Sequence, residues 1–135
     1  MKELVGKTVN KILISPNDET LVFETNDGPL AYQTEGDCCS STWFESITGV
    51  EALLGKTVNK EESIDMPEPP SREYKSGHYC DVLQDYGEKL ATDGGVADIV
   101  YRNSSNGYYG GSIYRIGAPN DLSNFKEITD DWTAS

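Results

Sequence analysis

Basic residues are scarce in this sequence. It contains 11 lysines and arginines against 23 aspartates and glutamates in 135 residues, a formal net charge of −12 at pH 7. Direct binding to DNA or RNA needs a basic surface that displaces counterions from the phosphates. The charge therefore argues against direct nucleic-acid binding as the main function. It favours either a partner with a basic surface or a role of the charge in solubility alone.

Cysteine and histidine are also rare. The chain has Cys38, Cys39 and Cys80, and His78 is the sole histidine. An odd cysteine count with two adjacent cysteines argues against a disulfide framework. Structural zinc sites usually space their cysteines by about two to four residues, and this set does not. No metal and no cofactor are therefore predicted.

Long apolar runs are missing as well. No stretch approaches the roughly 18 apolar residues of a membrane-spanning helix. No hydrophobic signal segment follows Met1. We expect a cytoplasmic protein that does not contact membranes.

No catalytic constellation stands out. Nucleophilic catalysis would need a serine or cysteine beside a base, and His78 is the only imidazole in the chain. Gly-Lys-Thr at residues 6–8 and 55–57 resembles the end of a phosphate-binding loop, but both copies lack the upstream glycine. A carboxylate-based hydrolase stays open, because so many acidic residues make some close pair inevitable and uninformative. We predict no catalytic residues and favour a protein that is not an enzyme.

One six-residue sequence occurs twice. GKTVNK occupies residues 6–11 and 55–60, and Leu4 and Leu53 stand two places upstream of the two copies. Each copy is followed in outline by apolar stretches around an Asp-Gly turn. We interpret this as a duplicated antiparallel β-meander with half-repeats at 4–48 and 53–116. Each half alone would leave a sheet face uncovered, so residues 1–135 are expected to form a single domain.

Turn-forming residues separate the apolar stretches. Residues 15–18 and 26–28 are predicted turns. Asn106-Gly107 is the strongest hairpin signal, because both residues tolerate positive φ. A two-residue turn there would pair Val100 with Ile113. The buried face of this hairpin would then contain Ala97, Ile99, Tyr101, Tyr114 and Ile116.

Helix is predicted in only two places. Residues 49–55 fit one or two turns that end at a left-handed Gly55. Residues 121–132 fit a helix capped by Asp121, with apolar residues at helical spacing. Residues 66–77 are a proline-rich surface insertion, and residues 117–135 form a C-terminal segment. The predicted fold class is therefore mainly β, a β-rich α+β arrangement of antiparallel meander hairpins with one or two short helices.

Two segments form the candidate binding site. Residues 37–44 and 102–111 each combine small hydrogen-bonding residues with adjacent aromatic residues. Arg102 offers a planar fork suited to carboxylate or phosphate, and the aromatic pairs could stack on a flat ligand or anchor a partner. The same residue types build ordinary turns beside core aromatics, which is the structural alternative. The candidate binding residues are Asp37, Cys38, Trp43, Phe44, Arg102, Asn103, Ser104, Ser105, Asn106, Tyr108 and Tyr109.

These segments carry a family resemblance. GDCCS at residues 36–40, followed by Trp43 and Phe44, and RNSSNGYYGGS at residues 102–112 resemble the two blocks of a small uncharacterised family found in bacteriophages and prophages. The resemblance implies a virus-encoded protein located in the host-cell cytoplasm. It brings no activity and no catalytic residue with it.

Three functional hypotheses follow. The first is a phage-encoded, non-enzymatic acidic accessory protein that binds and modulates a host protein with a basic surface, such as a defence or nucleic-acid enzyme. The second is a protein whose two polar-aromatic segments sequester a small ligand, such as a nucleotide-like signal. The third is a weak hydrolase or metal-binding protein.

Overall fold

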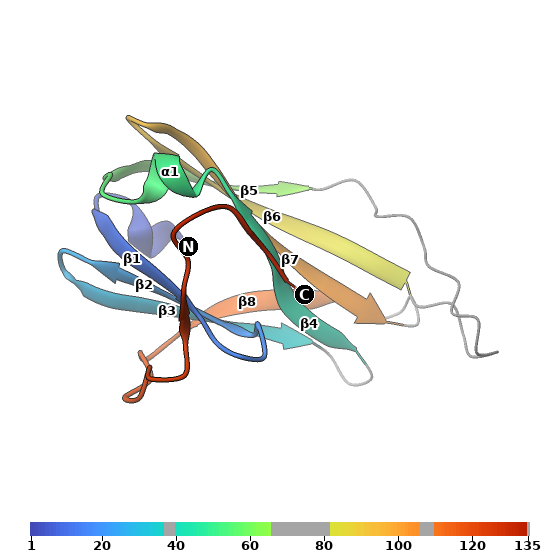
Figure 1. The fold of residues 1–135 in the computed structure, drawn as a ribbon. Helices are drawn as coiled ribbons and strands as arrows, with labels where there is room; N and C mark the ends of the chain where they lie inside the picture. Colours follow the sequence, from blue (N-terminus) through green and yellow to red (C-terminus); the bar gives the residue numbers. More distant parts are fainter. Residues whose placement is uncertain (37–39, 66–81, 106–109, 135) are drawn as a thin grey trace.

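Strands dominate the computed structural model, which describes residues 1–36, 40–65, 82–105 and 110–134 (Figure 1). All pairings between its named strands are antiparallel. The prediction of a mainly β fold is therefore confirmed. The elements in chain order are the 3₁₀ turn η1 (Lys2–Leu4), β1 (Val9–Ile14), β2 (Thr20–Thr25), β3 (Gly28–Gly36), β4 (Ser41–Thr48), helix α1 (Val50–Leu53), β5 (Val58–Asp65), β6 (Val82–Thr92), β7 (Gly95–Ser105), β8 (Gly111–Ile116), β9 (Lys126–Glu127) and β10 (Trp132–Thr133).

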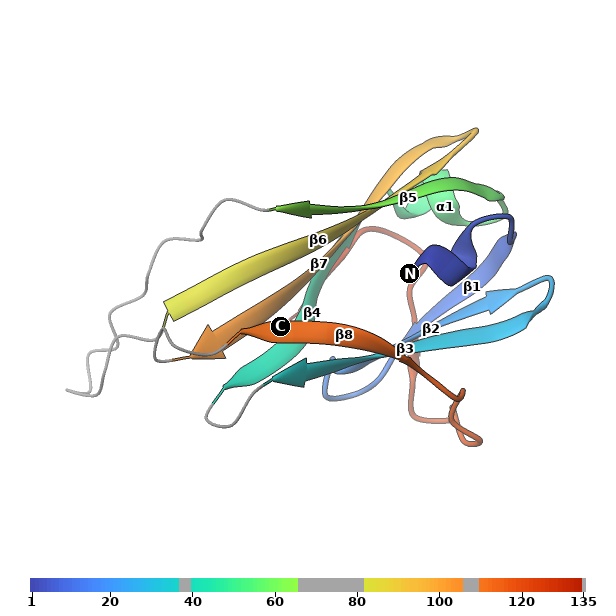
Figure 2. The same ribbon diagram turned by 180° about the vertical axis from the view of Figure 1, so that it is seen from behind.

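The strands form two five-stranded sheets, seen from opposite sides in Figures 1 and 2. The first sheet has the order β8-β3-β2-β1-β9, and the second has the order β10-β4-β7-β6-β5. The chain builds β1, β2 and β3 in the first sheet and then places β4 in the second. It builds β5, β6 and β7 in the second sheet and then returns β8 to the first. The fourth strand of each half thus pairs with the third strand of the other half.

The two copies of GKTVNK lie against each other and make reciprocal backbone hydrogen bonds. The Gly6 N–H donates to the Val58 carbonyl at 2.8 Å, and the Gly55 N–H donates to the Val9 carbonyl at 2.7 Å. Both glycines adopt positive φ, +85° at Gly6 and +76° at Gly55. The repeated sequence therefore produces the same local backbone in both halves.

One main core lies between the sheets and draws residues from both. Phe44 of β4 packs edge-on against Tyr101 of β7, with ring centroids 6.5 Å apart, and Tyr86 of β6 stacks on Tyr101 at 5.0 Å. The predicted burial of Ala97, Ile99 and Tyr101 is confirmed. The largest fully buried side chains are Tyr32, Phe23, Phe44, Leu4, Ile12, Ile14, Leu21, Ile47, Leu53, Leu90, Ile99 and Val9.

The predicted hairpin between the last two long strands is wrong. β7 pairs with β4 and β6, whereas β8 pairs with β3, where Ile113 lies opposite Thr34 rather than Val100. β7 is central in its sheet, so both of its edges are already occupied and β8 has to pair elsewhere. Tyr114, expected to be buried, is 45% exposed. Ile116 is half-buried and packs on a second small core cluster on the first sheet.

One helix prediction is confirmed and the other is wrong. Helix α1 forms within residues 49–55, and the chain then turns through Gly55. Residues 121–132 instead supply β9, which pairs with β1, and the start of β10, which pairs with β4. The backbone groups at two sheet edges thereby gain partners that a helix would have left unpaired. The predicted insertion at 66–77 lies outside the described residues.

Candidate functional site

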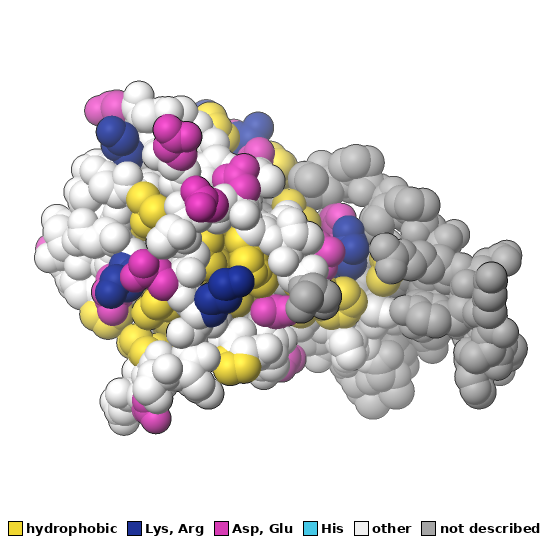
Figure 3. Space-filling view, in the orientation of Figure 1, with side chains coloured by type: hydrophobic (Ala, Val, Ile, Leu, Met, Phe, Trp, Pro, Cys, Tyr) yellow, Lys and Arg dark blue, Asp and Glu magenta, His cyan; other side chains and the backbone are white. Residues whose placement is uncertain are grey.

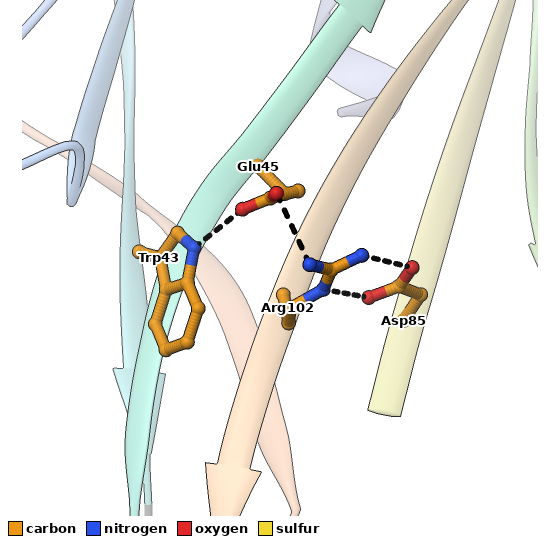
Figure 4. Close-up of polar contacts among 4 residues, drawn as sticks. All are labelled: Trp43, Glu45, Asp85 and Arg102. Atoms are coloured by element: carbon orange, nitrogen blue, oxygen red, sulfur yellow. Dashed lines mark hydrogen bonds and ion pairs between the residues drawn. The ribbon is translucent and has the colours of Figure 1, made fainter. Parts of the chain in front are cut away.

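A polar cluster lies on the outer face of the second sheet, opposite the core. Its members are Trp43 and Glu45 of β4, Asp85 of β6 and Arg102 of β7 (Figure 4). Trp43 and Asp85 each lie directly across from Arg102 in the adjacent strands. Successive residues of a strand point to opposite faces, so the sheet that buries Phe44 and Tyr101 turns their neighbours outward. We call these four residues the Arg102 cluster.

The side chains of the Arg102 cluster are hydrogen-bonded to one another. Arg102 donates two hydrogen bonds to Asp85, from Nε to Oδ1 at 2.7 Å and from Nη2 to Oδ2 at 3.0 Å. Its Nη1 donates to Glu45 Oε1 at 3.1 Å, and the Trp43 indole Nε1 donates to Glu45 Oε2 at 2.7 Å. The charged side chains are only 13–19% exposed. Geometry and partial burial together hold the indole ring in one orientation.

A β-bulge explains how Glu45 reaches this cluster. The register between β4 and β7 shifts between Phe44 and Ser46, so Glu45 is the extra residue on β4. A bulge breaks the regular alternation of side chains and can redirect one of them. Here Glu45 joins Trp43 and Arg102 on the outer face.

The charges of the Arg102 cluster do not balance. One guanidinium faces two carboxylates, which leaves a formal charge of −1. The hydrogen bonds that Arg102 donates to Asp85, and then the charges of both carboxylates, raise the pKa of Arg102 above its ordinary value against the effect of burial. Binding an external phosphate or carboxylate through Arg102 would require breaking these bonds. The arrangement is better suited to a cation than to an anion.

A hollow lies beside the Arg102 cluster, where the turn between β1 and β2 packs on β4. The Phe44 N–H donates to the Asp18 carbonyl at 2.7 Å and fixes this turn, in which Asp18 has a φ of +61°. We call this space the Trp43 hollow; its volume is about 310 Å³. The residues lining it are Asn17, Asp18, Glu19, Ser41, Thr42, Trp43 and Ala134.

A second polar space opens between the sheets. This inter-sheet cleft has a volume of about 270 Å³ and is lined by residues of η1, β3, β5 and β8. Figure 2 labels β5, β8 and the N-terminus, beside which η1 lies. The Tyr32 hydroxyl donates to Glu3 Oε1 at 2.8 Å on one wall, and Arg115 lies on another. Lys2 of η1 and Glu61 and Ser63 of β5 also line the cleft.

Glu88 lies next to this cleft on the inner face of β6 and is only 6% exposed. The Ser63 hydroxyl is 3.0 Å from both of its carboxyl oxygens. Burial first, and then a hydrogen bond with Glu61, raise the pKa of Glu88 to about 7. The Glu88 carboxyl therefore keeps its proton to near-neutral pH.

The structure pairs the two predicted segments as neighbouring strands and divides their described residues between the two faces of the second sheet. Asn103 and Ser105 belong to β7 rather than to a loop, and both are buried. Asn103 accepts a 2.8 Å hydrogen bond from the Thr42 hydroxyl. Phe44 is fully buried in the core, where its ring cannot stack on a ligand at the surface, and Ser104 is half-buried on the same strand as Arg102. Asp37, Cys38, Asn106, Tyr108 and Tyr109 lie outside the described residues, as do Cys39, Cys80 and His78.

Sequence reasoning named Trp43 and Arg102 but missed Glu45 and Asp85. A usable signal for Asp85 was the Asp-Gly pair at residues 93–94, which joins β6 to β7. The pairing of Thr92 with Gly95 sets the register that places Asp85 opposite Arg102. The bulge that positions Glu45 has no comparable signal in a single sequence.

Together these features define an acidic protein of two antiparallel sheets, whose halves share one strand order and whose outer face carries an indole held among carboxylates. The chain belongs to the family described as "Domain of unknown function (DUF7448)", whose family model matches residues 2–115. It is 33% identical over 112 residues to "Uncharacterized protein L278" of Acanthamoeba polyphaga mimivirus. The aligned region covers 79% of this chain and 85% of the relative. No solved structure matches.

The viral source of this relative agrees with the viral half of the expectation from the sequence. A bacteriophage or prophage origin stays a prediction. No helix in the described ranges is long and apolar enough to span a membrane. Within the same ranges, no group of three or more histidine, cysteine, aspartate or glutamate residues is arranged to hold a metal ion.

Proposed function

We propose that this protein is a virus-encoded, non-enzymatic module that binds a host protein with a basic surface and modulates it in the cytoplasm. The binding face in this proposal is the outer face of the second sheet around Trp43. The observation that supports it is the Arg102 cluster, which holds a half-buried indole beside a net negative charge.

Interface energetics support this assignment. Tryptophan is among the residues that dominate binding energy at protein interfaces, especially where its surroundings exclude water. The hydrogen bond to Glu45 already fixes the indole, so little side-chain entropy remains to be lost on association. The protein's net charge of −12 would accelerate the approach of a basic partner.

The charge on one face of the molecule favours a local site over a broad acidic patch. On the face in Figure 3, acidic side chains lie scattered among basic and hydrophobic ones. Scattered charges steer a partner but do not define where it docks. The defined geometry of the Arg102 cluster and the adjacent hollow supports docking at Trp43.

Affinity capture from lysate of the host cell, with partners identified by mass spectrometry, tests this proposal. The wild-type protein should retain a host protein that Trp43→Ala loses, and retention should weaken as salt is raised. Tyr114→Ala is the matched control, because Tyr114 is an exposed aromatic residue on the other sheet. A partner that survives Trp43→Ala and is lost with Tyr114→Ala would contradict the assignment.

Sequestration of a small ligand is the second candidate function, and the inter-sheet cleft supports it. Arg102 is engaged by Asp85 and Glu45, so the cleft fits a ligand better than the segment around Arg102 does. It presents phenols, a hydroxyl, carboxylates, a guanidinium and the ammonium of Lys2 around a space of about 270 Å³. Native mass spectrometry of the purified protein should then show a bound small molecule that Arg115→Ala removes. A ligand-free spectrum at native mass would count against this function.

A further inference from the structure

The Trp43 hollow combines an aromatic ring with carboxylates from the neighbouring turn. Asp18 and Glu19 come from the turn between β1 and β2, and Trp43 comes from β4. The Asn17 side-chain amide donates to Glu19 Oε2 at 2.6 Å, which holds that carboxylate in place. Among the described residues that line the hollow there is no lysine or arginine. The hollow therefore gathers negative charge around an indole without a cation in its lining.

The carboxylates around the hollow repel one another. Burial raises the pKa of Asp18, and the nearby charge of Glu45 raises it further, while Lys126 of β9 opposes both effects. The Asp18 carboxylate thus carries an electrostatic penalty that the protein itself only partly offsets. A cation placed in the hollow would relieve that penalty by direct attraction to these carboxylates.

The position of Trp43 adds a specific preference. Because its Nε1 is bound to Glu45, the ring is held at the edge of the hollow with its orientation fixed. Cations are attracted to the face of an indole more strongly than to other aromatic rings. A guanidinium can stack on the ring and also pair with a carboxylate through two parallel hydrogen bonds, whereas an ammonium is a compact point charge.

The size of the hollow is sufficient for one side chain. Its volume of about 310 Å³ is at the lower end of the range for ligand pockets. The hollow also adjoins the Arg102 cluster, so a side chain entering it would belong to a partner lying on the outer face of the second sheet.

We propose that the Trp43 hollow receives an arginine side chain of the partner protein, which stacks on Trp43 and pairs with Asp18 and Glu19. This inference rests on the proposed function, because it names the chemical group that the binding face recognises. The hollow is then the specificity pocket of the interface, and the Arg102 cluster is the support that holds its aromatic wall in place.

N-acetyl-arginine amide is a direct probe of this pocket. It should shift the NMR signal of the Trp43 indole N–H, assigned by its loss in Trp43→Phe, with a dissociation constant on the order of millimolar. N-acetyl-citrulline amide has nearly the same shape without the charge and should leave the signal in place. Equal shifts from both probes, or no shift from either, would overturn the proposal.

Charge-neutralising variants locate the contact. Asp18→Asn should weaken arginine binding about two- to fivefold, and the double variant with Glu19→Gln should weaken it further. Asparagine tolerates the positive φ of Asp18, so the turn should be preserved. Glu51→Gln removes one exposed charge from α1 and serves as the matched control. An equal loss in Glu51→Gln would show that only the overall charge matters and would refute the pocket.

The two proposals fail in different ways. Capture of a host partner that depends on Trp43 but not on Asp18 and Glu19 would leave the proposed function standing and refute the arginine pocket. Specific arginine binding combined with capture that is insensitive to Trp43→Ala would refute the proposed binding face.

Discussion

The hydroxyl groups of Thr8 and Thr57 lie 2.7 Å apart, at the point where the two copies of the repeated sequence meet. The two threonines occupy the same position in the two copies and face each other across an antiparallel bridge. The same residue therefore contacts its own counterpart, as in the interface of a symmetric dimer. This contact joins the starts of β1 and β5, which lie in different sheets.

The first prediction concerns the glycines of this junction. A Cβ added at Gly6 or Gly55 would meet no atom within 4 Å, so only the left-handed backbone opposes a side chain there. We expect Gly6→Ala and Gly55→Ala each to lower the free energy of unfolding by about 1 kcal/mol, measured by urea denaturation. Gly117→Ala is the control, because Gly117 has open space and no positive φ. Unequal losses at Gly6 and Gly55 would contradict their structural equivalence.

The second prediction concerns Arg102. With Arg102 present, the side chains of Asp85 and Glu45 are only 13% and 18% exposed. Arg102→Ala would remove the cation that both carboxylates pair with, which should lower the free energy of unfolding by about 2–3 kcal/mol. Arg102→Lys should recover only part of this loss, because lysine cannot form the bidentate pair of hydrogen bonds that Arg102 makes with Asp85. Arg115→Ala should cost less than about 0.5 kcal/mol, since Arg115 is exposed. A small effect of Arg102→Ala would show that the cluster does not contribute to stability.

The third prediction concerns pH. A glutamate ordinarily titrates near 4.5, and in the folded protein the pKa of Glu88 is about 7. Between these values the folded state holds a proton that the unfolded state has lost. Stability should therefore fall as pH rises from about 4.5 to about 7, by on the order of 3 kcal/mol, and this contribution should be constant above that range.

Urea denaturation from pH 4.5 to pH 8 measures this effect. Glu88→Gln carries no titratable proton, so its stability should decline less than that of the wild type over the same range. Glu62→Gln, at an exposed position of the neighbouring strand, should retain the wild-type slope. Parallel curves for the wild type and Glu88→Gln would show that Glu88 is not the group responsible.

Local patterns in the sequence predicted many of the elements but not all of their partners, and they predicted a helix at residues 121–132 where β9 and the start of β10 lie. The mainly β character, the turn at residues 15–18 and the helix before Gly55 follow from short-range preferences that a single sequence displays. The pairing of β8 with β3 does not, because it depends on which sheet has a free edge after β7 is enclosed. Asn106-Gly107 is a strong local signal for a hairpin, and the competition for strand edges overrode it.

The candidate site shows the same division. Trp43 and Arg102 attracted notice as residue types, yet they were assigned to separate loops, and the pairing of β4 with β7 makes them direct neighbours. Phe44 and Asn103 looked equally suitable, but strand alternation turns both of them inward. The face of the sheet on which a residue lies decided its role. Assigning a residue to a face requires the strand register, which composition and spacing do not supply.

The last prediction follows from the strand exchange. Among the described residues, β4 pairs with β7 and β10, and β8 pairs with β3, so each of these strands depends on the other half of the chain. Fragments 1–54 and 55–135 should therefore each lack a cooperative unfolding transition when purified alone. An equimolar mixture should recover native near-ultraviolet circular dichroism and one cooperative transition, because the exchanged strands then find their partners. If either fragment alone unfolds cooperatively as a monomer, that half can complete a sheet by itself, and the exchange of β4 and β8 is not what joins the two halves into one domain.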